Sequence, residues 1–533
     1  MNITVMLGGP SAEREVSLRS GAAVAEALRS CGHQVHQLDP QQEPWQLAPG
    51  TPVVFLALHG TYGEDDPVPH RLEHGYGLQP ATIERLHAAG ARVIVSVDCG
   101  IRAAEAAARA AEIGVDLIIT DHHEPGDALP PALAVINPKR VDCTYPDKRL
   151  AGAGVALKVV QALFATAGRG PEALPPFVKI AAIGTLADIV PLIGENRVIA
   201  HCGLHALSVG PHSAGIEALL AESGLLGREL DSMHVGFVLA PRLNAAGRMH
   251  SPDLAADLLL LRGRDDDVRS RARELARQLS EQNARRQEEE ATILAEARKV
   301  IDHDPDVGGQ NVLVVAGDGW HRGVIGIVAS KLVEAYHKPT IVLSVEDGVA
   351  QGSGRSIAGF DLLAGLESCA DVFLRFGGHK MAAGMTLAGD RVDELRRRLA
   401  ARANAELSPD DLVPRLRIDA EMALGEISGD VVRVLARLGP FGMANPKPVF
   451  RAAPVDLVAP PRKLKERHLS LVVKQAGRAF RAMAWRAADR EAYLSAHRYG
   501  LELAYSLDET EYRGERLTEL TVADLRVPDG APA

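Results

Sequence analysis

An apolar run ends in three polar side chains in the stretch Gly114-Val-Asp-Leu-Ile-Ile-Thr-Asp-His-His-Glu-Pro125. Leu117 to Ile119 are aliphatic without alternation, which is typical of a strand buried on both faces of a parallel sheet. Ligands of open α/β sheets bind beyond the carboxyl ends of the strands, and a carboxylate with two imidazoles suits a divalent metal. Asp121, His122 and His123 are therefore candidate site residues. A solvated turn is the alternative, since Asp and His are ordinary turn residues.

The flanking sequence predicts a β-α-β unit whose strands both end in an acid. A strand over 92–97 ends at Asp98, a helix follows over 103–113, and the quoted stretch supplies the next strand. Neighbouring parallel strands place their carboxyl ends side by side, so Asp98 and Asp121 are expected at one edge of the sheet. A third apolar strand over 134–136 ends in Asn137. An apolar helix over 180–191 contains Asp188, and a buried acid needs a partner such as a metal ion.

The bulk composition indicates a folded protein of several domains. Of the 533 residues, 46% are hydrophobic and 24% are charged. No stretch has the roughly 18 uncharged apolar residues of a membrane span, and no signal peptide is evident, so a cytoplasmic protein is expected. Five scattered cysteines without a Cys-x-x-Cys pair argue against a zinc ribbon or a disulfide framework. The net charge of -10 leaves a local basic groove as the only kind of nucleic-acid site.

Residues 1–66 are expected to form a small α/β segment. Its loops GGPSAEREVSLRSG and LALHGTYGED resemble the N-terminal domain of D-alanine:D-alanine ligase, a likeness that implies a substrate-orienting role for Glu13. The ATP-binding portion that performs ligation is not found downstream, so ligase activity is not expected. The sequence changes character near Asp66, which indicates either a gene fusion or a misassembled sequence.

From residue 67 onward a second set of motifs follows. In order, they are PHRLEHGYGL, VSVDCGI, ITDHHEP, INPKR, AGAGVALKVVQAL, LADIVPL, LAPRLNAAGRM, GSGRSI, RFGGHKMAAGMTL and PFGMANPKPVF. Together they resemble the RecJ exonucleases of the DHH/DHHA1 phosphoesterase family. The resemblance implies an α/β fold with a parallel-sheet DHH domain over 67–264, a long connecting helix over 265–301, a smaller α/β DHHA1 domain over 302–405 and an OB-like β-barrel over 406–533. The connecting helix is charged with a thin apolar stripe, so a solvated spacer is expected.

The resemblance also implies an activity and a set of site residues. The expected activity is 5′-to-3′ exonuclease cleavage of single-stranded DNA in repair and recombination, with Mn²⁺ or Mg²⁺ as cofactor. Carried over by motif, the metal ligands are Asp98, His122 and Asp188. Asp121 would support these ligands, and His123 would face the scissile phosphate. The residues expected to bind DNA are Arg248, Arg355, Ser356, Gly377, Gly378 and His379. Single-stranded DNA is the one partner that follows, and no repair-protein partner is indicated.

Two local patterns also favour phosphate binding. The glycine-bearing segments over 352–356 and 377–380 are expected to be loops whose amides approach a phosphate closely. In the C-terminal part, Arg462, Lys463 and Lys465 form a basic cluster beside an alternating strand, as in the groove of an OB fold. Taken alone, that cluster would be read as a solvated surface loop.

The first motif of the family is missing. A strand ending in Asp-Tyr-Asp-x-Asp-Gly, which supplies ligands to both metals, belongs shortly before Pro69. The aspartates before Pro69 are Asp39, Asp65 and Asp66, and no Asp-x-Asp occurs there. Two alternatives therefore stand beside an active exonuclease. One is a protein that binds single-stranded DNA without cutting it, and the other is a DHH-DHHA1 phosphodiesterase of small oligonucleotides, which the C-terminal barrel disfavours.

Overall fold

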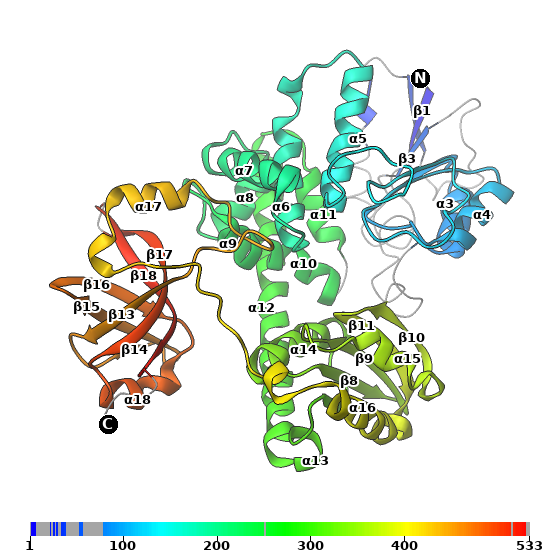
Figure 1. Ribbon diagram of the computed structural model, residues 1–533. Helices are drawn as coiled ribbons and strands as arrows, with labels where there is room; N and C mark the ends of the chain where they lie inside the picture. Colours follow the sequence, from blue (N-terminus) through cyan, green and yellow to red (C-terminus); the bar gives the residue numbers. More distant parts are fainter. Residues whose placement is uncertain are drawn as a thin grey trace. The chain divides into compact units, whose positions relative to one another are not determined.

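The computed structural model describes residues 78–249, 252–512 and 515–528, together with three upstream strands and helical positions 22, 25, 26, 28 and 29. Two compact units make up the chain (Figure 1), one from Met1–Val190 with Val198–Pro414 and one from Pro191–Arg197 with Arg415–Ala533. The ligase-like loops, Glu13, the junction near Asp66 and nearly all of PHRLEHGYGL lie outside the described residues. None of the described helices is both long and apolar enough to cross a membrane.

The first unit begins with two parallel sheets of three strands each. One has the order β2-β1-β3, from β1 (Asn2–Met6), β2 (Gln34–Leu38) and β3 (Val53–Leu56). The other has the order β4-β5-β6, from β4 (Val93–Val97), β5 (Asp116–Thr120) and β6 (Ala134–Ile136). The core of this second sheet also includes residues of helices α3 (Pro80–Ala88) and α4 (Ala104–Glu112). The expected parallel β-α-β unit is therefore present.

A group of helices follows the parallel sheet. They are α5 (Gly152–Thr166), α6 (Pro175–Ala187), α7 (Gly194–Val209), α8 (Ala214–Glu222), α9 (Ser232–His234), the π-helical turn η2 (Val235–Leu239), α10 (Ala240–Met249) and α11 (Asp253–Leu260). The prediction that a helix over 180–191 contains Asp188 is wrong, because α6 ends at Ala187. Asp188 still donates its backbone N–H to Gly184, but Ile189 has a positive φ of 57° and the helix cannot continue.

Helix α12 (Asp266–His303) has 38 residues, which corresponds to about 57 Å at the rise of an α-helix. The expectation of a solvated spacer is wrong, because one stripe of this helix is buried along its length. Leu275 and Leu279 belong to a core shared with the preceding helices, whereas Ile293 and Ile301 belong to a core shared with the following domain. The helix is therefore part of both cores rather than a tether between them.

The following domain is a five-stranded sheet with the order β10-β11-β9-β8-β7. Its strands are β7 (Leu313–Asp318), β8 (Thr340–Glu346), β9 (Val349–Arg355), β10 (Phe373–His379) and β11 (Ala382–Ala388), and its helices are α13 (Pro305–Gly308), α14 (Arg322–Tyr336), α15 (Leu362–Glu367) and α16 (Val392–Glu406). Alternate residues of β8 face opposite cores. Ile341 and Leu343 pack with α15 and α16, while Val342 packs with α12 and α14. The sheet is thus covered on both faces, as expected for a smaller α/β domain (Figure 1).

The glycine-bearing segments of this domain are strands, so the expectation of loops is wrong. Residues 352–355 lie in β9, which pairs with β8 and β11 on its two sides and therefore uses its amides in the sheet. The glycines serve close packing instead. A Cβ on Gly352 would lie 2.4 Å from Leu343, and one on Gly378 would lie 2.4 Å from the carbonyl oxygen of Ala382. Gly377 and Gly378 are in β10, the edge strand of this sheet.

The second unit contains the expected barrel. Its strands are β12 (Ala420–Glu421), β13 (Phe450–Leu457), β14 (Arg462–Leu464), β15 (His468–Gln475), β16 (Arg478–Ala484), β17 (Leu501–Tyr512) and β18 (Glu515–Arg526), with helices α17 (Gly429–Ala436) and α18 (Glu491–Ala496). The order is β12-β13-β17-β18-β16-β15-β14, and a further pairing of β13 with β15 closes the ring. Leu469, Leu471 and Val473 alternate along β15 and point into the core, as their spacing predicts.

The packing of α12 can be tested by truncating one of its buried leucines. Leu279 is fully buried, so Leu279→Ala should lower the free energy of unfolding by about 2 to 5 kcal/mol. Urea unfolding followed by circular dichroism measures this effect. The matched control is Glu288→Ala on an exposed position of the same helix, which should have almost no effect. Equal free energies of unfolding for the two variants would support the interpretation of α12 as a solvated spacer helix.

Candidate metal and phosphoesterase site

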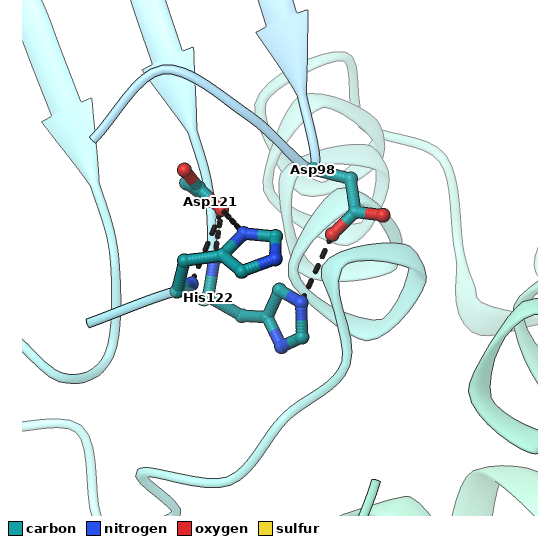
Figure 2. Close-up of side chains that lie close together, drawn as sticks. Asp98, Asp121 and His122 are labelled. Atoms are coloured by element: carbon teal, nitrogen blue, oxygen red, sulfur yellow. Dashed lines mark hydrogen bonds and ion pairs between the residues drawn. The ribbon is translucent and has the colours of Figure 1, made fainter. Parts of the chain in front are cut away.

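The carboxyl ends of β4 and β5 bring together the polar residues of two motifs. Val97 pairs with Thr120 in parallel register, so Asp98 and Asp121 follow neighbouring strands directly. One ligand atom from each of Asp98, Asp121, His122 and His123 lies within 4.8 Å of the others. Figure 2 shows the side chains of Asp98, Asp121 and His122 converging at this edge. The structure therefore places these residues together, as the strand-end argument predicts.

Asp121 is the most buried and most extensively hydrogen-bonded side chain of the four at this edge of the sheet. Its side chain is 1% exposed. One oxygen accepts the backbone N–H groups of His122 and His123 and the Nδ1–H of His123, at 2.7, 3.2 and 2.7 Å. The other oxygen accepts the N–H of Ile101 at 2.9 Å. Burial raises the pKa of the Asp121 carboxyl, but these hydrogen bonds outweigh burial and lower it to about 2. Asp121 is thus an ionised anchor for the turn.

His122 and His123 use their rings differently. The bond to Asp121 raises the pKa of His123 and holds its Nδ1, so Nε2 is the ring nitrogen that remains available. His123 is also the more open of the two, with 60% of its side chain exposed. Nε2 of His122 is buried and, within the described residues, makes no hydrogen bond of good geometry. This nitrogen lies 3.0 Å from Oδ1 of Asp98 and 3.5 Å from Oδ2 of Asp188 (Figure 2 shows the pair with Asp98).

A divalent cation fits the groups around Nε2 of His122. Burial raises the pKa of the Asp188 carboxyl, and although His122 opposes this, the charge of Asp98 adds to it. A cation would relieve the repulsion between the two carboxylates and would accept the lone pair of the imidazole nitrogen that lies close to both. One nitrogen with two carboxylate oxygens is a donor set that suits Mn²⁺. Asp121 is less suited, because both of its oxygens already accept hydrogen bonds.

Asp98 depends on a glycine distant in the sequence. Its backbone has a positive φ of 64°, an unfavourable conformation for a residue with a side chain. A Cβ on Gly152, at the start of α5, would lie 2.1 Å from Oδ1 of Asp98. The AGAG motif therefore leaves room for the Asp98 carboxylate. The pattern of small residues was visible in the sequence, but not which side chain they accommodate.

Asn137 is a second supporting residue that the site prediction did not include. It is buried, and its Nδ2 donates to the backbone carbonyl of His123 at 2.9 Å. Its Oδ1 accepts the N–H of Lys139 at 2.8 Å. Asn137 thus ties the strand end after β6 to the histidine turn after β5. The signal for this role was an apolar strand that ends in Asn-Pro at the same edge of the sheet.

The predicted DNA-binding residues of the smaller α/β domain occupy different environments. The guanidinium of Arg355 donates to Ser353 at 3.0 Å and to the carbonyl of Gly354 at 2.8 Å, and its Nη2 lies near Gly326 of α14. Ser356 is buried and its hydroxyl donates to the carbonyl of Phe360 at 2.7 Å. His379 is exposed at the end of β10. His379 is therefore exposed, whereas Arg355 is half-buried and Ser356 mainly stabilises the fold.

Arg248 links the helical region to α14. Its Nη1 donates to the carbonyl of Gly323 at 3.1 Å, and a Cβ on Gly323 would lie 2.3 Å from the carbonyl oxygen of Arg248. The first turn of α14 therefore packs closely on Arg248. The structure joins Arg248 to the smaller α/β domain and records no bond from Arg248 to the metal-ligand cluster within the described residues.

The basic cluster of the barrel lies on β14 and in the turn after it. Arg462 and Lys465 flank Lys463, whose Nζ pairs with Glu491 at 2.8 Å. The prediction missed Trp485, which follows β16 and is 57% exposed. Its ring packs edge-on against His468 with centroids 4.9 Å apart, and His468 pairs with Leu464 in the sheet. An exposed aromatic ring beside basic residues is typical of surfaces that stack single-stranded bases.

The fold and the histidine turn define the DHH class of phosphoesterases, and three family models match in this order. The model described as "DHH family, N-terminal domain" matches residues 17–185, the DHHA1 domain matches 309–405 and the RecJ OB domain matches 418–524. The single-stranded-DNA-specific exonuclease RecJ of Dickeya dadantii is 37% identical over 90% of this chain and 85% of its own length. The chain belongs to the RecJ family.

Two further comparisons define the extent of the likeness. RecJ of Bacillus subtilis is 42% identical over 72% of this chain, but the chain spans only 47% of that protein. The crystal structure of RecJ in complex with Mn²⁺ from Thermus thermophilus has a TM-score of 0.71 and 29% identity, and the match covers 99% of this chain and 69% of that one.

The N-terminal likeness is separate. D-alanine–D-alanine ligase of Aquifex aeolicus is 52% identical over 75 residues, which is 14% of this chain and 26% of the ligase. This supports the resemblance of residues 1–66. Only a quarter of the ligase is matched, so the expectation that ligase activity is absent stays a prediction.

Substitution of Gly152 tests how Asp98 is held. Gly152→Ala should weaken Mn²⁺ binding by about 10- to 100-fold, because the new methyl group would displace the Asp98 carboxylate. Titration of free Mn²⁺ by electron paramagnetic resonance measures the affinity. Gly154→Ala on the same helix is the control, since its Cβ would meet only apolar side chains, at 3.3 Å or more. Equal Mn²⁺ affinities for the two variants would show that Gly152 does not position Asp98.

Proposed function

We propose that this chain is a metal-dependent exonuclease that hydrolyses single-stranded DNA from its 5′ end in DNA repair and recombination. The relatives that support this are named single-stranded-DNA-specific exonucleases. The one structural observation that carries the proposal is the position of the buried Nε2 of His122, which lies 3.0 Å from the carboxylate of Asp98 and 3.5 Å from that of Asp188. The comparisons do not favour the alternatives of a non-cutting DNA-binding protein or a small-oligonucleotide phosphodiesterase.

Asp98, His122 and Asp188 would hold Mn²⁺ or Mg²⁺. A divalent ion bound there supplies an activated water and polarises a phosphoryl oxygen. Asp121 orients both histidines through the bonds to their backbone and to the ring of His123. The bond to Asp121 raises the pKa of His123 and so favours its protonated ring, in which Nε2–H can donate to an oxygen of the scissile phosphate while Nδ1–H donates to Asp121. The remaining groups would bind the strand: Arg355 and His379 through phosphates, and the basic turn of the barrel through the backbone of the DNA.

A nuclease assay on labelled single-stranded DNA with Mn²⁺ tests this function. His122→Ala should lower the rate at least about 100-fold, because the cluster loses its only imidazole ligand. His201→Ala, an exposed histidine of α7, is the control and should cut like the unaltered chain. A rate unaffected by His122→Ala would place the activity elsewhere. If a strand labelled at its 3′ end is not shortened from its 5′ end, the proposed 5′-to-3′ polarity is contradicted.

The missing first motif leads to a second prediction about rate. The cluster offers three ligand side chains, and no Asp-x-Asp precedes Pro69. Two-metal hydrolysis stabilises both the attacking and the leaving oxygen, so a site with few carboxylates should cut slowly. Replacing residues 1–66 by a strand that ends in Asp-Tyr-Asp-x-Asp-Gly should raise the rate. The same strand with its aspartates changed to asparagine is the control. If the unaltered chain cuts as fast as the grafted one, the missing motif is not limiting.

Salt dependence tests the barrel surface. Replacing Arg462, Lys463 and Lys465 by alanine should flatten the fall of DNA affinity with salt, because phosphate contacts release counterions. Fluorescence anisotropy with a labelled single strand measures the slope. The control replaces Arg417, Arg433 and Arg437, three exposed arginines of the same unit outside that turn. Equal slopes for the two triple variants would move the DNA-binding surface away from β14.

A further inference from the structure

A cavity of about 500 Å³ lies among helices α7, α8 and α12, in the helical region of the first unit. Its lining includes Arg264, Arg269 and Arg273, which lie on α12 or just before it. It also includes His212, Ala214 and Glu217, which lie on α8 or just before it. Three arginines and one glutamate line it, so its charge is positive. None of these residues belongs to the metal-ligand cluster. We call this cavity the arginine pocket.

Within the part of the chain that the structure describes, Arg264, Arg269 and Arg273 are exposed and form no ion pair with a carboxylate. Arg264 donates to the carbonyl of His212 at 3.2 Å, and Arg273 donates to the hydroxyl of Ser270 at 3.1 Å. Neither of these partners carries a negative charge. Arg269 and Arg273 are four residues apart on α12, and like charges at that spacing destabilise a helix. Solvent screens part of this repulsion because both arginines are exposed, and an anion between them would reduce it further.

A buried lysine adds to the positive charge behind the pocket wall. Lys179 of α6 is 4% exposed. Its Nζ donates to the carbonyl of Pro211 at 2.5 Å and lies 3.4 Å from Nδ1 of His212. Among the described residues, no carboxylate pairs with it, and burial lowers its pKa. A buried cation without a counter-ion is costly, so an anion near His212 would stabilise this wall.

The surroundings limit the size of that anion. A second hollow of about 460 Å³ shares Arg273 with the pocket and is lined by Glu222, Glu274 and Arg277 as well. Arg277 there pairs with Glu274 at 2.7 Å, so the positive charge does not continue along α12. A long polyanion such as a DNA strand would meet these acids. The pocket also has apolar walls from Val209, Ala218 and Leu226, which suit a base or another flat apolar group.

We propose that the arginine pocket binds a phosphorylated small molecule of nucleotide size, a nucleoside 5′-monophosphate. The guanidinium groups of Arg269 and Arg273 would hold the phosphate in forked hydrogen bonds, and the apolar wall would hold the base. The volume lies within the usual range of small-molecule sites. If the proposed exonuclease activity is correct, molecules of this class are its products, so the pocket would respond to the progress of the reaction. The response to reaction products rests on the proposed function, whereas the proposal of a nucleotide-binding site does not.

Isothermal titration calorimetry with thymidine 5′-monophosphate tests the pocket, in EDTA so that no metal site contributes. Saturable binding is expected, and the double substitution Arg269→Gln and Arg273→Gln should weaken it at least about tenfold, since charge-assisted bonds to the phosphate are lost. The matched control is Arg285→Gln with Arg298→Gln, two exposed arginines of the same helix, which should leave the affinity unchanged. Absence of saturable binding, or an equal loss in the control, would overturn the proposal.

Three further titrations separate the sources of phosphate. Inorganic phosphate should bind more weakly than the nucleotide, and equal affinity would overturn the assignment of a nucleotide. A short thymidine oligonucleotide should bind the double variant as tightly as it binds the unaltered chain. A weaker affinity of the double variant for the oligonucleotide would make the arginine pocket part of the DNA-binding surface and would overturn the proposal. His122→Ala should keep its affinity for the nucleotide. If His122→Ala abolishes that affinity, the nucleotide binds at the metal-ligand cluster, which overturns the pocket and leaves the proposed exonuclease standing.

Discussion

The buried carboxylate of Asp121 fixes the turn on which the rest of the site depends. It accepts four hydrogen bonds, from the backbone of Ile101, His122 and His123 and from the ring of His123. Those bonds join the loop after β4 to the turn after β5. They compensate for the cost of burying a charge and leave the two imidazoles with separate roles. His122 faces Asp98 and Asp188, whereas His123 keeps one nitrogen open toward solvent.

The geometry around this turn has a cost that the surrounding chain offsets. Asp98 adopts a strained backbone conformation with a φ of 64°, and two carboxylates crowd one imidazole nitrogen. Gly152 leaves space for Asp98, and Asn137 holds the carbonyl of His123. Strain of this kind persists where the surrounding structure determines it, and it is common at sites that bind metals or substrates. The strain is therefore consistent with a site built for a cation rather than for stability alone.

The sequence was sufficient for features that depend on local patterns. Apolar runs that end in Asp98 and Asp121 predicted two parallel strands and their common edge, and alternating Leu469 and Leu471 predicted the barrel strand β15. The sequence was insufficient for residues whose contact partners lie far away in the chain. The thin apolar stripe of α12 was visible in the sequence, but its burial in two cores was not, and the glycines of β9 indicated loops although they are required by sheet packing. Gly152 could not be assigned for the same reason, and the position of Asn137 at the end of a strand placed it at the sheet edge without showing which group it supports.

We propose that Asp98, His122 and Asp188 form one divalent-metal site whose nitrogen ligand is Nε2 of His122. The most direct measurement is the number of Mn²⁺ ions bound per chain and their affinity, in the unaltered protein, in His122→Ala and in His123→Ala. One bound ion is expected, lost in His122→Ala and retained in His123→Ala, because His123 pairs with Asp121 and is not one of the three proposed ligands. Retention of the ion in His122→Ala, or its loss in His123→Ala alone, would contradict the account.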